Sequence, residues 1–449
     1  MKIARGFAAA EQLLTRKAGF LLPESSPRLK ERLMELFGTD VPAEAVAQII
    51  AGVQARGDAA LKDYTARIDG VSLPSLEVPP EQVKASCKQV TPQLLSDLKT
   101  AAAEVRRFHE KQRDAFLVGT GKMAPGTVAR TLKRVGLYIP GGTASYPSSV
   151  LMTAIPAKVA GVSEVIIATP PGKDGQVPAR TLAAAYLAGV DRVFAMGGAQ
   201  AIAALAYGTE SVPKVDKVCG PGNLFVMLAK KQVYGAVDID GLQGPSEVVV
   251  IAEEGANPAW VAGDILAQAE HDAMAQSILI TTSESLAQSV QKVIEDEMCL
   301  QERRAIIEES LNSRGVIAVV RSLDEAIDLT NLYAPEHLCL YIKDAAKYVE
   351  RIANAGCVFI GVHPTVVMGD YVAGPSHALP TSGTARFASP LNVTDFIRLM
   401  NVVNVDDDML QRLSATAASL ARAEGLTAHA RAVKAENPEG KQCLRAEKE

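Results

Sequence analysis

Apolar residues in the first part of the chain recur at the spacing that is typical of amphipathic helices. In the segment 42–68 they stand three and four positions apart. They are Val46, Ile49, Ile50 and Val53. The segment 97–116 has the same character. We therefore expect two long helices here, preceded by a helical arm over residues 1–33.

From residue 134 onward the pattern changes to short β-branched runs that alternate with helical segments. The expected strands cover residues 134–140, 164–169, 192–196, 217–219, 247–252, 277–281, 316–320, 338–342 and 357–361. Among the intervening helices, one begins with Asn257 as N-cap and Pro258 at the first helical position, and we expect it to reach about Ala273. Strands that alternate with helices in this way indicate parallel sheets, and the strand signals stop after Pro390.

Composition places the chain among ordinary globular proteins and excludes several classes. Of the 449 residues, 48% are hydrophobic and 22% are charged, which argues against disordered, collagen-like and coiled-coil chains. A net charge of -5 without a dense basic block argues against nucleic-acid binding. No apolar run approaches the ~20 residues of a membrane helix, and the N-terminus lacks the apolar core of a secretory signal. Six scattered cysteines without a C-x-x-C pair indicate free thiols. We therefore expect a cytoplasmic protein without a membrane or nucleic-acid partner.

The helix expected after strand 247–252 carries a candidate metal site. Gln268 and His271 are three residues apart, so on a helix they share a face and could present two groups to one metal ion. The alternative is an ordinary solvent-exposed face. Residue type alone would favour Glu270 over Gln268, because a carboxylate is the commoner ligand.

Two loops carry further acid and imidazole groups. Asp370 and His377 lie in a glycine-rich stretch after strand 357–361, and loops at the carboxyl ends of parallel strands are where α/β proteins keep their sites. Glu336 and His337 are adjacent on a proline-fixed loop and could supply two proton-handling groups. The structural alternatives are turn formation by the aspartate and chance adjacency of the acid and the imidazole.

The C-terminal segment and three glycine-rich turns complete the candidates. Glu424 and His429 flank a glycine helix stop and could reach one ligand, or they could be solvated surface groups. The turns at 141–142, 197–198 and 220–223 each follow a strand, where backbone amides could cradle a phosphate. None matches the G-x-G-x-x-G fingerprint or the P-loop, so these turns alone leave dinucleotide binding open.

Eight of these segments, in this order, closely resemble the histidinol dehydrogenase family. They are VGLYIPGGTASYPSSVLMTAIPAKVAGV (135–162), MGGAQAIAALAYGT (196–209), VDKVCGPGN (215–223), GPSEVVVIA (244–252), LAQAEHD (266–272), YAPEHL (333–338), GDYVAGPSHALPTSGTARF (369–387) and AEGLTAHARAV (423–433). The resemblance extends from about Val41 to Val433. It implies a homodimer with shared active sites and one Zn²⁺ per subunit. The implied reaction is two successive NAD⁺-dependent oxidations, from L-histidinol to histidinal and on to L-histidine.

The resemblance also implies roles for individual residues. The implied metal ligands are Gln268, His271, Asp370 and His429. The implied catalytic proton acceptors are Glu336 and His337. The implied substrate contacts are Ser246, His337, Asp370, His377 and Glu424, joined by the metal ligands Gln268, His271 and His429. The implied NAD contacts are Tyr138, Gln200 and Asn223.

The expected fold is therefore α/β, with two incomplete Rossmann-like parallel-sheet domains, a small N-terminal helical arm and a small C-terminal helical domain. The expected domains are the arm at 1–33, a metal- and substrate-binding domain at 34–137 plus 245–391, an NAD-binding domain at 138–244 and a helical tail domain at 392–449. The tail domain is expected to complete the active site of the partner subunit.

One departure and two alternatives bear on the substrate. Leu242 and Gln243 precede Gly244, where the family pattern has a small residue beside the glycine, and this loop borders the substrate. Paralogues of the family oxidise other polyols, including sulfonated diols. Glu424 and His429 favour histidinol, because a carboxylate suits its cationic amine and would repel a sulfonate. A zinc-dependent hydrolase or an inactive binding protein is the alternative of another class.

Overall fold

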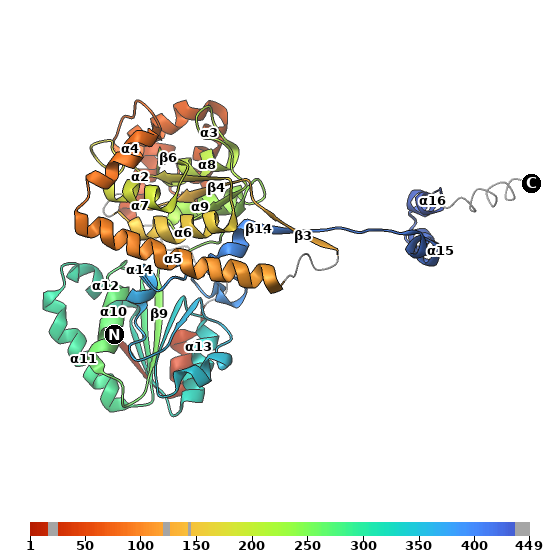
Figure 1. Ribbon diagram of the computed structural model, residues 1–449. Coiled ribbons are helices and arrows are strands. Elements are labelled where there is room, and N and C mark those ends of the chain that lie inside the picture. The colour runs from red at the N-terminus through yellow and green to blue at the C-terminus, as the bar shows by residue number, and fades with distance from the viewer. Residues whose placement is uncertain (17–25, 120–125, 142–144, 436–449) are drawn as a thin grey trace, which may run out of the picture. The chain divides into compact units, whose positions relative to one another are not determined.

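The computed structural model describes residues 1–16, 26–119, 126–141 and 145–435, and the chain divides into two compact units. Unit 1 comprises Met1–Leu117 and Thr131–Arg398, and unit 2 comprises Val118–Arg130 and Leu399–Glu449. Unit 1 carries two six-stranded sheets, each packed between helices (Figure 1). This architecture confirms the predicted α/β class with two parallel-sheet domains.

The first sheet, here called the N-sheet, has the strand order of a Rossmann domain. Its strands are β2 (Glu77–Val78), β4 (Arg134–Tyr138), β5 (Glu164–Thr169), β6 (Arg192–Ala195), β7 (Lys217–Cys219) and β8 (Asp238–Ile239). They lie in the order β2-β6-β5-β4-β7-β8, and all pairs are parallel except β2 with β6. Strands β4 to β8 thus follow the 3-2-1-4-5 order of a doubly wound sheet, one strand short of a full Rossmann domain. Its topological switch point lies between β4 and β7.

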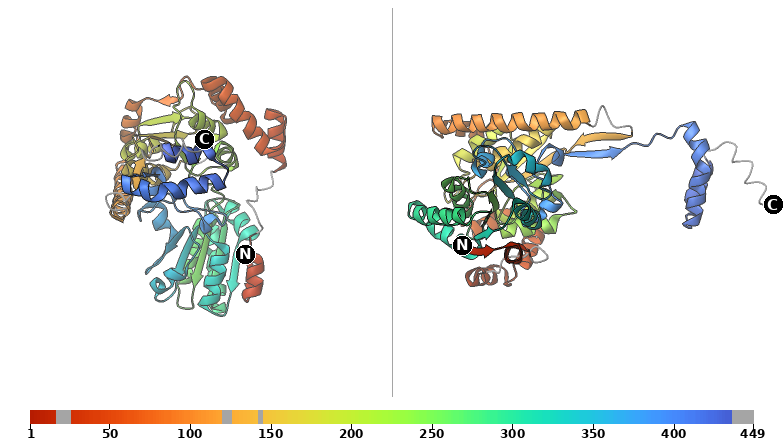
Figure 2. Two further views of the ribbon diagram at one scale, coloured as in Figure 1. Left: turned by 90° about the vertical axis from the view of Figure 1, so that its right-hand side faces the viewer. Right: turned by 90° about the horizontal axis from the view of Figure 1, so that it is seen from below.

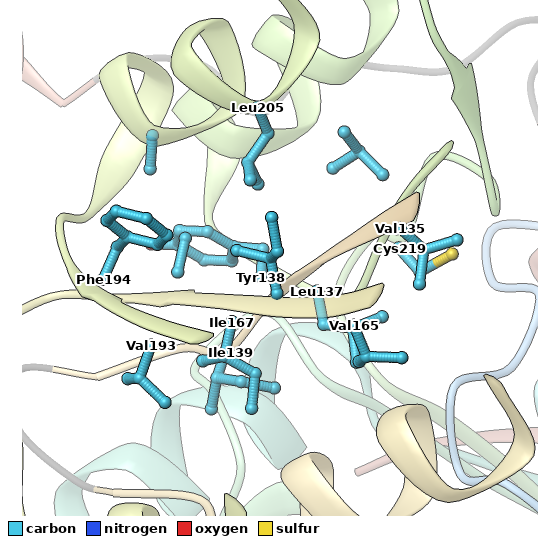
Figure 3. Packing of buried hydrophobic residues seen from close by; sticks show 14 of the residues in the cluster. Val135, Leu137, Tyr138, Ile139, Val165, Ile167, Val193, Phe194, Leu205 and Cys219 are labelled. Atoms are coloured by element: carbon cyan, nitrogen blue, oxygen red, sulfur yellow. The ribbon is translucent and has the colours of Figure 1, made fainter. Parts of the chain in front are cut away.

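Helices pack on the N-sheet, and their apolar side chains form one continuous core with those of its strands. The bounds are α3 (Pro42–Tyr64), α6 (Pro147–Ala160), α7 (Ala179–Ala188), α8 (Gly198–Tyr207) and α9 (Leu224–Val233). Figure 3 shows Leu205 of α8 and Phe194 on one side of the sheet, with Ile139 and Val193 on the other, as the two-residue period of strands requires. Gly136 lets α8 approach, because a Cβ there would lie 2.9 Å from the Leu205 side chain.

The second sheet, here called the C-sheet, repeats the same order. Its strands are β1 (Lys2–Arg5), β9 (Glu247–Ala252), β10 (Gln276–Thr281), β11 (Val316–Val319), β12 (His337–Tyr341) and β13 (Cys357–Phe359). They lie in the order β1-β11-β10-β9-β12-β13, and all pairs are parallel. The switch point therefore lies between β9 and β12. Its helices are α1 (Phe7–Leu14), α10 (Pro258–Ala269), α11 (Glu284–Glu297), α12 (Arg304–Arg314) and α13 (Leu323–Tyr333), with α10 to α12 on the opposite side from α13 in Figure 1.

One helical stretch, Pro27–Asp69, is long and apolar enough to cross a membrane by length and composition, a test that core helices also pass. It consists of α2 (Pro27–Phe37), α3 and a π-helical turn. On α3, Val46, Ile49 and Val53 are buried in the N-sheet core, where α3 packs on α8 and α9. This apolar face identifies α3 as a core helix.

Further helices complete the described part of this fold. They are α4 (Pro80–Ala85), α5 (Pro92–Gly119) and α14 (Val366–Tyr371). Helix α5 begins five residues before the predicted start, because Pro92 occupies its first position, where a missing N–H costs nothing.

Unit 2 is built from two helices, α15 (Asp407–Ala423) and α16 (Thr427–Ala435), which lie side by side (Figure 2). Strand β3 (Thr127–Thr131) pairs with β14 (Ile397–Asn401) in a separate two-stranded sheet. The tail predicted from residue 392 thus contains a strand, β14, which follows a short 3-10 helix at Val393–Phe396.

The helices of unit 2 have little apolar core of their own. Among their described side chains, the buried apolar ones are Ala418 and Ala430, whereas Leu413, Leu420 and Leu426 are exposed. So small a core leaves these helices in need of another surface to pack on.

The structure corrects the predicted domain boundaries. Lys2–Arg5, expected in the helical arm, form the parallel edge strand β1, and residues 17–25 of that arm lie outside the described residues. Residues 34–137, expected beside the C-sheet, instead supply α3 and β4 to the N-sheet. At the other end, Val393 and Phe396 of the predicted tail are buried in the N-sheet core. These long-range packings leave no local signal in the sequence.

Candidate active site

Glu336 and His337 lie where the neighbouring strands β9 and β12 begin, and both are hydrogen-bonded to the backbone there. Glu336 immediately precedes β12, His337 is its first residue, and both are buried. The backbone N–H of Glu247, the first residue of β9, donates to Glu336 Oε2 at 2.8 Å. His337 Nδ1 donates to the backbone carbonyl of Glu247 at 3.0 Å. One residue of the neighbouring strand therefore fixes both side chains.

Asp370 on α14 brings a further carboxylate to His337. Its Oδ1 lies 3.6 Å from His337 Nε2. Because Nδ1 donates to a carbonyl, Nε2 carries the lone pair of a neutral ring, and it is buried without a hydrogen-bond partner among the described residues. Burial lowers the pKa of His337, but the carboxylates of Glu336 and Asp370 outweigh burial and raise the pKa well above its ordinary value. These carboxylates therefore stabilise the imidazolium that forms when the neutral ring accepts a proton at Nε2.

His377 lies beside the same group in a fixed tautomer. Its Nδ1 donates to the backbone carbonyl of Asp370 at 2.9 Å, and its Nε2 accepts from the Ser149 hydroxyl at 3.1 Å. Burial lowers the pKa of His377, so the ring is neutral near neutral pH. Since Ser149 lies in the first turn of α6, after β4, this bond connects the C-sheet site to the N-sheet.

Gln268 and His271 lie near the same edge, but they do not share a helix. Helix α10 ends at Ala269 rather than at about Ala273, and His271 follows in a turn whose backbone N–H donates to the Gln268 carbonyl at 3.3 Å. Gln268 is buried, and its Nε2 has no partner among the described residues, whereas His271 is exposed.

The pKa of Asp370 is affected by the neighbouring histidines. Burial by itself raises the pKa of Asp370. The larger effect comes from His337, which, with smaller contributions from His377 and His271, brings the pKa below its ordinary value. His271 therefore lies close enough to Asp370 to interact with its charge. An anionic carboxylate, a buried amide and an exposed imidazole are suitable metal donors.

The predicted donors are divided between the two units. Ser246, which precedes β9, belongs to unit 1 with the residues above, while Glu424 and His429 are exposed in unit 2, at the end of α15 and in α16. Within the described ranges, no cluster of three or more His, Cys, Asp or Glu side chains could hold a metal ion. The predicted set differs from such a cluster because it includes a glutamine and draws on both units.

The three predicted NAD contacts lie at the carboxyl edge of the N-sheet, around its switch point. Tyr138 ends β4, and its hydroxyl accepts from the backbone N–H of Gly198 at 3.1 Å. Burial raises the pKa of Tyr138 to about 12, so the hydroxyl keeps its proton. Both polar atoms of the Gln200 amide are buried without a partner among the described residues. Asn223 caps α9, with its Oδ1 accepting from the backbone of Phe225 and Val226, which leaves its amide hydrogens for a ligand.

A buried ion pair holds the turn between β7 and α9. Lys230 pairs with Asp240 and donates to the carbonyl of Gly220 at 3.1 Å and to Gln243 Oε1 at 2.7 Å. Gly220 has φ +114°, and a Cβ there would lie 2.1 Å from the Tyr138 carbonyl oxygen. Gln243, which departs from the family pattern, thus accepts a hydrogen bond from Lys230.

The sequence motifs identify these residues but not the edge of the sheet on which they meet. The carboxyl-end rule holds for the N-sheet. In the C-sheet, Glu336, His337 and Ser246 lie at the amino ends of the strands, and α14 brings Asp370 back to them. Glu247 and Ser149 were not predicted as site residues, because the backbone groups and the hydroxyl that they contribute follow no sequence motif.

Comparisons with known proteins agree with the resemblance found in the eight segments. The family model described as histidinol dehydrogenase matches residues 38–436. A histidinol dehydrogenase of Dehalococcoides mccartyi is 54% identical over 434 residues, covering 96% of this chain and 99% of that protein. One of Deinococcus radiodurans is 46% identical over 437 residues, with the same coverages. The crystal structure of histidinol dehydrogenase from Elizabethkingia anophelis is similar with a TM-score of 0.85 and 32% identity, covering 99% of each chain.

Proposed function

Because the chain belongs to the histidinol dehydrogenase family and is an oxidoreductase of class EC 1.1.1.23, we propose that it oxidises L-histidinol to L-histidine through histidinal, with NAD⁺ and zinc, in the cytoplasm. The observation that carries this proposal is the pair Glu336 and His337, two buried proton acceptors held by the backbone of Glu247. Two successive oxidations at one carbon release protons in both steps, so two acceptors suit this reaction.

His337 is suited to the alcohol oxidation. In the neutral ring Nε2 carries the lone pair and has no hydrogen-bond partner among the described residues, and the surrounding carboxylates stabilise the imidazolium once this nitrogen has accepted a proton. We assign it the hydroxyl proton of the alcohol. Glu336 is suited to the aldehyde oxidation, which requires water to add to the carbonyl, and its carboxylate would accept a proton from that water. Each such group contributes roughly 10²–10⁴-fold to the rate.

Gln268, His271 and Asp370 fit a zinc site in this chain. The Gln268 amide is buried without a partner among the described residues, and Asp370 interacts with the charge of His271. His429 would be the fourth ligand, from the partner subunit. When bound, Zn²⁺ supplies a Lewis acid that can hold the imidazole and amine nitrogens of histidinol.

Tyr138, Gln200 and Asn223 fit a dinucleotide. The orphaned amide of Gln200 and the free amide hydrogens of Asn223 offer hydrogen bonds at the helix starts of α8 and α9, where phosphates bind well. When bound, NAD⁺ supplies the hydride acceptor, and the protein's part is to orient it.

Ser246, His377 and Glu424 are the remaining proposed substrate contacts. His377 is held neutral by Asp370 and Ser149, so it presents a ring of fixed orientation. The exposed carboxylate of Glu424 suits the cationic amine of histidinol.

Unit 2 is proposed to complete the site of the partner subunit in a homodimer. Glu424 and His429 lie on helices with little core of their own and with Leu413, Leu420 and Leu426 exposed. Packing against a second copy would bury this apolar surface and bring both polar residues to a site.

A substrate panel tests the proposal. Purified protein is incubated with NAD⁺ and either L-histidinol or small diols, including a sulfonated one, and NADH is followed at 340 nm. We expect histidinol to be the preferred substrate by kcat/KM. Preference for a sulfonated diol would identify a polyol dehydrogenase, and no NADH with any alcohol would favour a hydrolase or a binding protein.

A further inference from the structure

Arg16 forms a buried, bidentate ion pair with Glu247, which lies 231 residues away in the sequence. Arg16 Nη1 donates to Glu247 Oε1 at 2.8 Å, and Nη2 donates to Oε2 at 2.6 Å. The Glu247 side chain is completely buried, and that of Arg16 is 21% exposed. A carboxylate this deep needs partners for its charge, and the parallel guanidinium fork is the strongest available to it.

Glu247 connects the ion pair directly to the proposed proton acceptors. The backbone N–H and carbonyl of Glu247 hold Glu336 and His337. The side-chain carboxylate of the same residue forms the ion pair with Arg16. The orientation of the Glu247 peptide groups, and with it the position of both acceptors, therefore depends on how its side chain is anchored.

Arg16 also holds the loop that leads into Glu336. Its Nε donates to the backbone carbonyl of Tyr333 at 2.8 Å, and its guanidinium lies 3.8 Å above the centre of the Tyr333 ring. The next residue, Ala334, has φ +53°, a left-handed conformation that is costly for a non-glycine residue and more so before a proline.

Another non-glycine residue with a positive φ, Ser382, contacts the ion pair directly. Ser382 has φ +57°, and its backbone N–H donates to Glu247 Oε1 at 3.2 Å. In the described parts of the chain, the non-glycine residues with positive φ are Ala334, Asp344 and Ser382. Of these, Ser382 donates to Glu247, and Ala334 directly follows Tyr333, whose carbonyl accepts from Arg16. Strain of this kind persists where the surroundings over-determine the backbone, and it gathers at functional sites.

We propose that Arg16 and Glu247 are positioning residues that hold Glu336 and His337 in the geometry for proton transfer, acting through the peptide groups of Glu247 and the Tyr333–Glu336 loop. The inference rests on the proposed function, since it concerns the efficiency of the same two acceptors. It predicts an effect on the chemical steps and not on cofactor binding, because the NAD contacts lie on the other sheet.

The test compares Arg16→Met with a matched control, Arg386→Met. Both arginines line one cavity of about 790 Å³, and both donate to carbonyls at the end of α13, but Arg386 bonds to those of Asn331 and Leu332 and not to Glu247. For Arg16→Met we expect kcat with histidinol to fall by about 10²-fold, the cost of a small misplacement of reacting groups. KM and the Kd for NADH, measured by fluorescence, should change less than about 3-fold. Arg386→Met should keep kcat within about 3-fold.

Hydrogen–deuterium exchange gives a readout that does not depend on activity. In Arg16→Met, peptides that cover residues 245–248 and 333–338 should exchange at least about 10-fold faster, and in Arg386→Met they should not. Glu247→Gln tests the pair from its other side and is used if Arg16→Met does not fold, as judged by circular dichroism. It should show the same kcat loss and faster exchange.

The outcomes separate this inference from the proposed function. Suppose that the wild type oxidises histidinol. The positioning role is then wrong if Arg16→Met keeps the wild-type kcat, or if only its KM or its Kd for NADH rises. It is also wrong if the fall in kcat is no larger in Arg16→Met than in Arg386→Met. If the wild type does not oxidise histidinol, the proposed function fails. The exchange rates then decide the positioning claim, and unchanged protection of the two peptides overturns it.

Discussion

Two inactive variants should restore activity to each other if the site is shared between subunits. Glu336 lies in unit 1 and His429 in unit 2, so Glu336→Gln and His429→Ala place their lesions in different units. In a mixed dimer with exchanged tails, one site receives both lesions and the other receives none. Random assortment makes about half of the dimers mixed, each with one intact site of two, so activity should recover to about a quarter of wild type by two-fold symmetry.

The assay is co-expression of the two variants with different affinity tags, followed by tandem purification of mixed dimers. The purified mixed dimers alone should show about half of the wild-type kcat per dimer and an unchanged KM, because the intact site is a wild-type site. The matched control pairs Glu336→Gln with Asp370→Asn, both in unit 1, and no recovery is expected there. Mixed dimers of the first pair that stay as inactive as their parents would refute the shared site.

The metal, the two proton acceptors, a buried histidine and a buried ion pair can each be tested separately. Purified protein should contain about one Zn²⁺ per chain, and His271→Ala should lose both zinc and activity; full activity after exhaustive chelation would contradict the metal's role. Single-turnover assays should show Glu336→Gln impaired mainly with histidinal and His337→Asn impaired with both substrates, and an alcohol-only defect in Glu336→Gln would reverse the assignment. Burial lowers the pKa of His109 below its ordinary 6.5, so the unfolded chain takes up this proton first and stability declines as the pH falls below about 6.5. Thermal denaturation of His109→Gln should show a shallower acid decline, and an identical decline would exclude this contribution. Lys230→Met leaves its buried carboxylate partner unpaired and should cost about 3–5 kcal/mol in urea unfolding, whereas a loss under about 1 kcal/mol would contradict the pair's importance.

The sequence predicts the central strands of both sheets well. The strands at 164–169 and 247–252 match β5 and β9 residue for residue. Both are continuous runs rich in valine and isoleucine, and a strand buried on both faces requires such a run. The edge strand Lys2–Arg5 is missed, because four residues with one buried side chain carry too little pattern.

The contacts that complete the site are not predictable from local pattern. Arg16 reaches Glu247 only because β1 and α1 place the N-terminal segment on the C-sheet. The assignment of residues 34–137 to the wrong sheet has the same origin, since an amphipathic helix does not encode which sheet covers its apolar face. The residues of the motifs were recognisable, but the amino edge on which they meet follows from topology.

The product balance of a complete reaction shows whether the chain oxidises histidinol all the way to the acid. Limiting L-histidinol is incubated with excess NAD⁺, NADH is measured by absorbance, and the organic product is identified by chromatography and mass spectrometry. We expect two NADH and one L-histidine for each histidinol consumed, because two acceptors at one site carry both oxidations to the acid. One NADH with an aldehyde as the end product, or no NADH at all, would contradict it.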